Sequence, residues 1–520
     1  MKTKRLPALL LAACLCLPLG SCAFSAKDPA AGEQNGPTQE EKAPAKDSLV
    51  IAISSEPSTL NPYDHSAVVC GYMNQMTFNK LFTIDLDTLE PVPELVESYS
   101  CSDDGLNWSF KLKEGVKFHN GEEMTAEDVC ASLEYAKTFA FCTRYTSFWT
   151  SLEPTGTYSF EITTVRPYSQ ALYDLSANSA CIVPKSLIES GNDFNANPVG
   201  TGPYIFSSKS SGDSITFTKN EDYFDQSHMP EIKTLTWKII PEGSSRTIGL
   251  ETGEIDLVID VEPSDIERLQ TEDGINVLSL VGTRINFMAM NSEKAPFDNI
   301  YFRKAINAAV DRQAVSDVAS GGLGAVSVSP NPQVYPGSTL ENTTDYSPSL
   351  ARKYLGISEV DTQSLVVKCL CYSDETRRSA EVIQAYLREV GITMEIESLD
   401  FAAFLSNMLD GNYECAVAGY SSTNMLTYMK GLWSSASIGA SNASRIKDAE
   451  LDSLIDLAQT QLDEDERNET LLEICRRTNE LSLLLPLYTS SVTRAYSSDL
   501  TGVKASSSGL MIYQDLRFAN

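Results

Sequence analysis

Hydrophobic residues follow strand-like and helix-like spacings in turn along most of the chain. Short apolar runs bounded by turn residues indicate strands, and apolar residues three and four apart indicate helices. The expected strands are 48–54, 108–112, 215–218, 232–240, 285–290, 392–396 and 483–489; the expected helices begin at Thr125 and cover 302–315, 378–390, 449–462 and 464–481. Mixed strands and helices without a short internal repeat predict an α/β architecture of more than one lobe.

The N-terminus departs from this pattern. A short basic start precedes the apolar stretch 6–19, which is shorter than the roughly 20 residues that a membrane-spanning helix needs. The stretch ends in Leu-Gly-Ser-Cys at Cys22, which resembles a bacterial lipobox, in which the cysteine is lipidated and the chain is cut before it. The alternative is an ordinary signal peptide that is cut a few residues later. We expect a lipoprotein signal peptide at 1–21, and a lipidated Cys22 that begins a flexible tether over 22–47.

Composition excludes several functional classes. The 520 residues are 42% hydrophobic and carry a formal net charge of −30, so nucleic acid is a poor partner. The three histidines, His65, His119 and His228, are far apart in sequence, which argues against a histidine-built metal site. We therefore expect neither a metal nor a cofactor.

Cysteines do not form a recognisable framework. Nine follow Cys22, and an odd, scattered set is not a disulfide pattern. Cys369 and Cys371 alternate within an apolar run, so we expect both thiols on one buried face of a strand.

An ordered series of motifs resembles the family 5 solute-binding proteins of ABC transporters, the oligopeptide, dipeptide and nickel-chelate binders. Each motif is weak alone, but together they extend over nearly the whole body. They are PVPELVESY (91–99), WSFKL (108–112), GVKFHNG (115–121), TAEDV (125–129), NPVGTGPY (197–204), GEID (253–256), APFD (295–298), RKAI (303–306) with DR (311–312), and LPLY (485–488).

The resemblance implies a two-lobed clamp of the periplasmic-binding-protein type (type II, with an extra inserted subdomain) that closes on solute about a hinge. Two chain crossings, 285–291 and 487–492, would form the hinge. The implied domains are lobe one at 48–282 with an inserted subdomain at about 81–196, lobe two at 283–490, and a return to lobe one at 491–520.

The same resemblance implies a peptide bound in extended form through its main chain, as in strand addition. Tyr420 stands where the family has a tryptophan, and Phe401 stands where many members have another cleft aromatic; core packing is the alternative for both. The implied ligand-binding residues are Ser55, Glu56, Pro57, Phe287, Phe401, Gly419, Tyr420, Ser421 and Thr423.

One departure from the family bears on the ligand. Thr423 occupies the place of the aspartate that pairs with a peptide ammonium, and no acid occurs from Ala416 to Lys447. The arginines that some members use for a ligand carboxylate are replaced by Met408 and Val417. A short free peptide held at both charged ends therefore fits less well than a longer or N-terminally atypical peptide.

Catalysis is not expected, because the chain carries no G-x-S-x-G elbow and no P-loop. We expect a monomeric solute-binding lipoprotein, held by its lipid at the outer face of the cytoplasmic membrane or in the periplasm. It would capture peptides for ABC permease subunits whose ATPases are separate chains. The alternatives are the same clamp with a non-peptide solute, such as a nickel or other metal chelate or a glycan, and a receptor for peptide signals.

Overall fold

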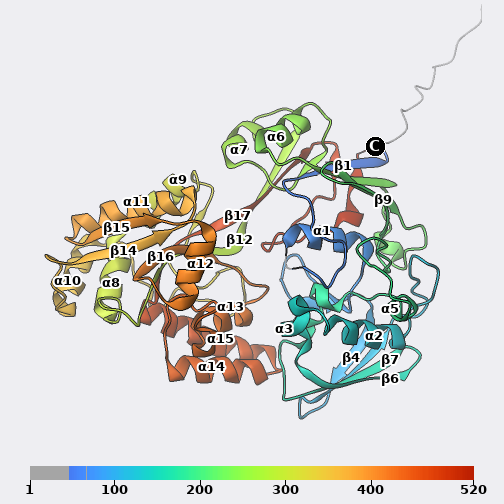
Figure 1. The fold of residues 1–520 in the computed structure, drawn as a ribbon, viewed down its shortest axis with the longest axis horizontal. Helices are drawn as coiled ribbons and strands as arrows, with labels where there is room; N and C mark the ends of the chain where they lie inside the picture. The colour runs from blue at the N-terminus through green and yellow to red at the C-terminus, as the bar shows by residue number, and fades with distance from the viewer. Residues whose placement is uncertain (1–45, 66, 520) are drawn as a thin grey trace, which may run out of the picture. The chain divides into compact units, whose positions relative to one another are not determined.

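Two long antiparallel strands connect the two halves of the molecule (Figure 1). The computed structural model describes residues 46–65 and 67–519. Strands β12 (Ile275–Met290) and β17 (Leu484–Ser497) pair along most of their length, and their register shifts between Val281 and Ile285. They form the centre of an eleven-stranded sheet with the path β15-β14-β16-β12-β17-β11-β1-β10-β9-β8, from which β13 branches at β17.

On one side of these strands lies the part that we call lobe one. Its parallel strands β1, β10 and β11 have no acid or base at their buried positions, and Leu49, Ile51 and Trp237 are fully buried. Its elements are β1 (Ser48–Ile53), β8 (Tyr204–Ser210), β9 (Ser214–Lys219), β10 (Thr234–Ile239), β11 (Leu257–Val258), α1 (Val68–Thr77), α6 (Gly243–Glu251) and α7 (Ile266–Leu269).

Between α1 and β8 the chain forms the inserted subdomain, a four-stranded antiparallel sheet with its own core. Thr125 caps α2 in a capping box with Asp128, as the sequence predicts. Its elements are β2 (Phe82–Ile84), β3 (Pro91–Pro93), β4 (Val96–Cys101), β5 (Asn107–Leu112), β6 (Trp149–Gly156), β7 (Ser159–Thr164), α2 (Ala126–Ala136), α3 (Thr143–Thr146), α4 (Ala171–Asp174) and α5 (Lys185–Glu189).

On the other side lies lobe two, with buried clusters on both faces of its strands. In Figure 1, α8, α10 and α11 lie around the outer strands, and α13, α14 and α15 gather below them. Its further elements are β13 (Ala325–Val326), β14 (Val366–Cys371), β15 (Thr393–Ser398), β16 (Cys415–Tyr420), α8 (Ile300–Ala309), α9 (Arg312–Ala319), α10 (Pro348–Ser358), α11 (Asp374–Glu389), α12 (Phe401–Asp410), α13 (Met425–Trp433), α14 (Ala449–Thr460) and α15 (Glu464–Leu481).

After β17 the chain runs along lobe one again. Leu500, Met511 and Tyr513 are buried in the same cluster as the residues of β1 and β10. A short antiparallel pair, β18 (Leu500–Thr501) and β19 (Arg517–Phe518), closes this segment.

The sequence predictions of secondary structure agree with the structure at most elements, and one was wrong. The single helix expected at 302–315 is two helices, α8 and α9. Val310 is extended, and the Asp311 side chain accepts a hydrogen bond from the Gln313 amide, which starts α9 anew. The long β12 also begins about ten residues before the strand that we expected at 285–290.

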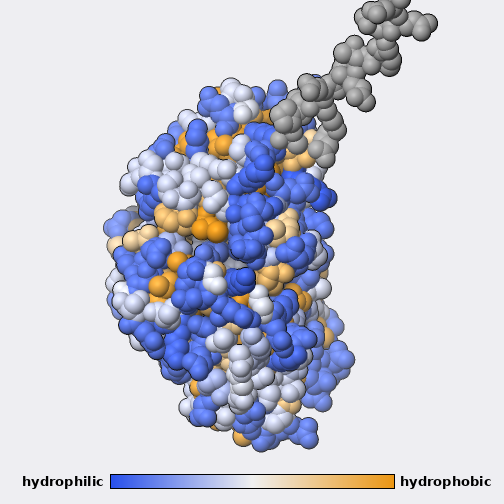
Figure 2. All heavy atoms as spheres, turned by 90° about the vertical axis from the view of Figure 1, so that its right-hand side faces the viewer, coloured by the Kyte–Doolittle hydropathy of each residue, from blue (hydrophilic) through white to orange (hydrophobic). Residues whose placement is uncertain are grey.

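The predicted signal peptide, Cys22 and nearly all of the tether lie outside the described residues. None of the helices in residues 46–65 and 67–519 has the length and apolar character needed to cross a membrane. Hydrophilic residues cover most of the face that Figure 2 shows, and hydrophobic ones occur in small groups. This surface agrees with the strongly acidic composition of the chain.

The nine cysteines of the described part are all unpaired, and all except Cys101 are buried. Cys369 and Cys371 lie on β14 and are fully buried, as their alternation predicts. Burial raises the pKa of the Cys142 thiol to about 11, which leaves almost no thiolate at neutral pH.

We expect the thiols of the folded body, residues 48–520, to react slowly with a maleimide, because only the thiolate attacks and the buried sulfurs are inaccessible. Cys101 should be labelled first, and the other eight cysteines only after denaturation. Mass spectrometry of the labelled protein before and after denaturation measures this. Rapid labelling of Cys369 or Cys371 in the native protein would contradict the burial that the structure shows.

Candidate functional site

Two of the predicted ligand-binding segments lie at the carboxyl ends of strands. Ser55–Pro57 follows β1, whose parallel neighbours are β10 and β11. Gly419 and Tyr420 end β16, which runs antiparallel to the hinge strand β12. Ligands of α/β sheets bind outside the carboxyl ends of strands, so both segments lie at edges suited to a solute. Ser55 and Ser421 are exposed.

Strand β16 has an open edge where its last residues lie. On one side it pairs with β12 as far as Tyr420. On the other side it pairs with β14 only at Cys415 and Ala416, because β14 ends at Cys371. In the described structure, Gly419 and Tyr420 therefore have no strand partner on the β14 side. An extended main chain can hydrogen-bond to such an edge.

Tyr420 has a structural role as well as a place at this edge. Its ring lies 5.3 Å from the ring of Tyr428, and it packs against the core cluster that includes Trp433. Its hydroxyl lies against Gly431, where a Cβ would be only 2.2 Å away. The side chain is half-buried, so packing fixes the ring while part of it stays accessible.

The two predicted phenylalanines differ in exposure. Phe287 is 1% exposed and packs within the core of lobe two, so in this structure its side chain has no surface to offer a solute. Phe401 is 57% exposed at the start of α12, and its ring lies 5.2 Å from that of Tyr372. Within the described residues, the aromatic contact of Phe401 is with Tyr372 and not with Tyr420.

Glu56 is already occupied within lobe one. Its carboxylate lies 2.9 Å from the Lys209 ammonium and accepts the amide hydrogen of Gly212. The hydrogen bond from Lys209 lowers the pKa of Glu56, which stays ionised and paired. Asp260 is an acid beside the Ser55 loop, and its Oδ2 accepts hydrogen bonds from the amide and the hydroxyl of Ser54. Its Oδ1 has no hydrogen bond within the described residues.

The sequence analysis missed Arg284, which lies beside Gly419 in the break between the two paired stretches of β12 and β17. A Cβ on Gly419 would lie 2.6 Å from an Nη atom of Arg284 and 2.7 Å from Oδ1 of Asn286. The guanidinium is thus seated against the backbone of the predicted binding segment. The sequence carried one signal for this residue. Arg284 is a single charged residue directly before the expected strand 285–290, which has no charged residue.

Away from the hinge, contacts that we call the latch join the inserted subdomain to lobe two. Leu89 is buried in the core cluster of lobe two, and Leu462 packs against the cluster of the inserted subdomain, over Gly105. The Ser169 amide donates to the Gln459 carbonyl, and its hydroxyl to the Ala458 carbonyl, both at 2.9 Å. These two carbonyl groups belong to the last turn of α14, where they have no N–H partner within the helix.

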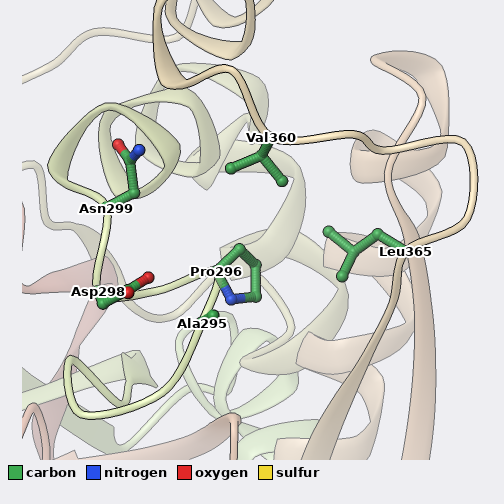
Figure 3. Close-up of a pocket in the computed structure, with 6 residues that line it drawn as sticks. All are labelled: Ala295, Pro296, Asp298, Asn299, Val360 and Leu365. Carbon is green, nitrogen blue, oxygen red and sulfur yellow. The ribbon is translucent and has the colours of Figure 1, made fainter.

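Cavities lie in lobe two and at the latch, and two of them bear on the site. One, of about 540 Å³, is lined by Ala295, Pro296, Asp298, Asn299, Val360 and Leu365 (Figure 3). The other, of about 20 Å³, lies between Gln170 of the inserted subdomain and Asn424 of lobe two. Neither contains a residue that we predicted to bind ligand. The second has room for about one water molecule, next to the buried Nδ2 of Asn424, which lacks a partner in the described structure.

His119 has the structural role that its motif suggests. Its Nε2 lies 2.9 Å from the Gly202 carbonyl oxygen, and burial lowers its pKa to about 4. In the described part of the chain, no group of three or more His, Cys, Asp or Glu side chains is arranged to hold a metal ion.

Comparison with known proteins agrees with this geometry. Residues 90–440, more than half of the chain, match the family model of bacterial extracellular solute-binding proteins, family 5. The chain belongs to this family. It is 25% identical to heme-binding protein A of Haemophilus influenzae, over 88% of this chain and 90% of that protein. It is equally 25% identical to a dipeptide-binding protein of Pseudomonas aeruginosa, over 89% and 93% of the two chains.

Solved structures show the same fold. HbpA2 from Haemophilus parasuis superposes with a TM-score of 0.84 at 23% identity, covering 91% of this chain and all of that one. The two-lobed α/β clamp of family 5 is therefore the architecture of this protein, as the motifs led us to expect.

We expect Leu89→Ala to loosen the latch, because a leucine side chain that is 3% exposed would no longer bury its apolar surface across the two parts. The loss of about 1–2 kcal/mol should shift the solute-free protein toward more open forms. Small-angle X-ray scattering should report a larger radius of gyration. Leu457→Ala, on α14 but 46% exposed, is the matched control. A radius unchanged by Leu89→Ala would show that Leu89 does not hold the two parts together.

Proposed function

We propose that this protein is an extracytoplasmic solute-binding lipoprotein that captures peptides and delivers them to an ABC importer. Membership of family 5 supports solute binding. The observation that carries the peptide assignment is the open edge of β16 at Gly419 and Tyr420, which offers main-chain groups to an extended ligand. In lobe one Ser55 is exposed as well, whereas Glu56 is half-buried and Pro57, which we also predicted to bind ligand, is buried.

The charges at the site favour certain peptides. Thr423 is exposed but neutral, and Glu56 is already paired with Lys209. A ligand ammonium would therefore have to reach Asp260, beside the Ser55 loop, or remain solvated. A desolvated ammonium without a carboxylate costs several kcal/mol, so longer or N-terminally blocked peptides are better ligands for this site than free dipeptides.

Native mass spectrometry of residues 48–520, purified from the host without unfolding, tests the proposed function. We expect co-purified peptides, released on denaturation and identified by fragmentation. Their length and N-terminal state would show how the site is matched to its ligand. A bound metal chelate, glycan or other non-peptide mass would contradict the peptide assignment and leave the solute-binding function standing.

We also expect Cys22→Ala to release the protein from the membrane, because the lipid on Cys22 is the proposed anchor. Detergent-phase partitioning, with labelling by a fatty-acid analogue, measures the change. Cys14→Ala is the matched control, since Cys14 would leave with the signal peptide. A Cys22→Ala protein that still carries the label and stays in the detergent phase would contradict lipidation at this residue.

A further inference from the structure

Arg284 differs from the buried arginines of this protein in how its donors are used. Arg246, Arg303, Arg312 and Arg494 are buried, and each donates to backbone carbonyl oxygens. Arg284 is half-buried, yet within residues 46–65 and 67–519 no hydrogen bond or ion pair to its side chain is recorded. Its guanidinium donors are thus available to a ligand.

The lack of an acid partner is informative in a chain with 70 acidic and 40 basic residues. Glu375 is on the same side of the hinge, but its Oε1 accepts the hydrogen of the Tyr488 hydroxyl at 2.6 Å. Other acids of lobe two are already paired with basic side chains: Glu293 with Arg445 and Lys447, and Asp448 with Arg477. A partly desolvated guanidinium that the protein leaves unpaired indicates an anion from outside the chain.

The position of Arg284 is suited to a ligand. Its guanidinium rests on Gly419, where the absence of a Cβ makes the close approach possible. Asn286 pairs with Gly419 in the sheet, and its Nδ2 donates to Ser490 Oγ at 2.8 Å, which fixes the adjoining side chain. The cation therefore lies next to the open edge of β16, on the strand about which the lobes turn.

We propose that Arg284 binds a carboxylate of the solute and so makes an acidic group on the ligand a requirement for capture. A guanidinium offers two parallel N–H donors that match a carboxylate in geometry and charge. The inference rests on the proposed function and adds the recognition of an acidic ligand. The inference also agrees with the neutral side chain of Thr423, which offers no partner for a ligand ammonium. The solute would instead be held through its carboxylate, at Arg284.

The test uses the small-molecule fraction of the host's spent medium as the probe, in three forms: untreated, with carboxyl groups converted to methylamides, and with amines dimethylated. The refolded, ligand-free body is incubated with each and analysed by native mass spectrometry. We expect adducts from the untreated and amine-blocked forms, and about tenfold fewer or none from the carboxyl-blocked form. Arg284→Gln should lose about tenfold of the adduct from the untreated form, whereas Arg388→Gln, an exposed arginine of α11, should not.

The outcomes separate this inference from the proposed function. Adducts that persist after carboxyl blocking, or that fall equally in both blocked forms, overturn the carboxylate requirement. Undiminished adducts in Arg284→Gln overturn the role of this residue. Failure of the wild-type protein to capture any solute from the untreated form overturns the proposed function, and this inference with it. Circular dichroism shows whether Arg284→Gln folds. If it does not, the blocked forms with the wild-type protein still decide whether a carboxylate is required. Arg284→Lys, which keeps the charge without the paired donors, then replaces Arg284→Gln as the variant.

Discussion

The antiparallel pairing of β12 with β17 is the constraint on which the rest of the structure depends. It makes one sheet of the strands of both lobes, and it places the ends of β1 and β16 on opposite sides of the same pair of strands. The register of this pairing shifts twice, between Val281 and Ile285 and between Asn286 and Phe287. The first of these shifts is the wider interruption. Gly282 lies there because a Cβ would come within 2.4 Å of the Ser490 carbonyl oxygen. The register shift, Gly282 and Arg284 thus lie within a few residues of one another on β12.

Local pattern was enough to predict the elements whose apolar spacing is regular. The helix expected at 464–481 coincides with α15, and the capping residue of α2 was identified from its sequence. The predictions failed where something other than apolar spacing sets the element. Val310 continues the apolar spacing of α8, but it is extended, and the side chain of Asp311 caps a new helix. The first half of β12 is mostly apolar but only partly buried, and its apolar residues do not alternate, so its pairing with β17 rather than its pattern identifies it as a strand.

The binding segments were proposed from motifs, whereas the charges around them could not be read from the sequence. The segments at Ser55 and Gly419 lie at the ends of β1 and β16. The pairing of Glu56 with Lys209 joins residues more than 150 positions apart, which no local pattern reveals. Phe287 was expected to contact ligand, but its side chain packs into the core of lobe two. Arg284, three positions before it, lies against Gly419 instead.

The apolar contacts of the latch make its stability depend on temperature. Leu89 and Leu462 each bury apolar surface against the other half of the molecule, so opening exposes hydrocarbon to water. Exposing apolar surface to water raises the heat capacity. The hydrophobic stabilisation that the closed latch gains from burying this surface is therefore weaker at lower temperature. The free energy that holds the latch shut therefore falls as the temperature drops, whereas the hydrogen bonds of Ser169 do not share this dependence. In a cold environment the latch therefore opens more readily than in a warm one.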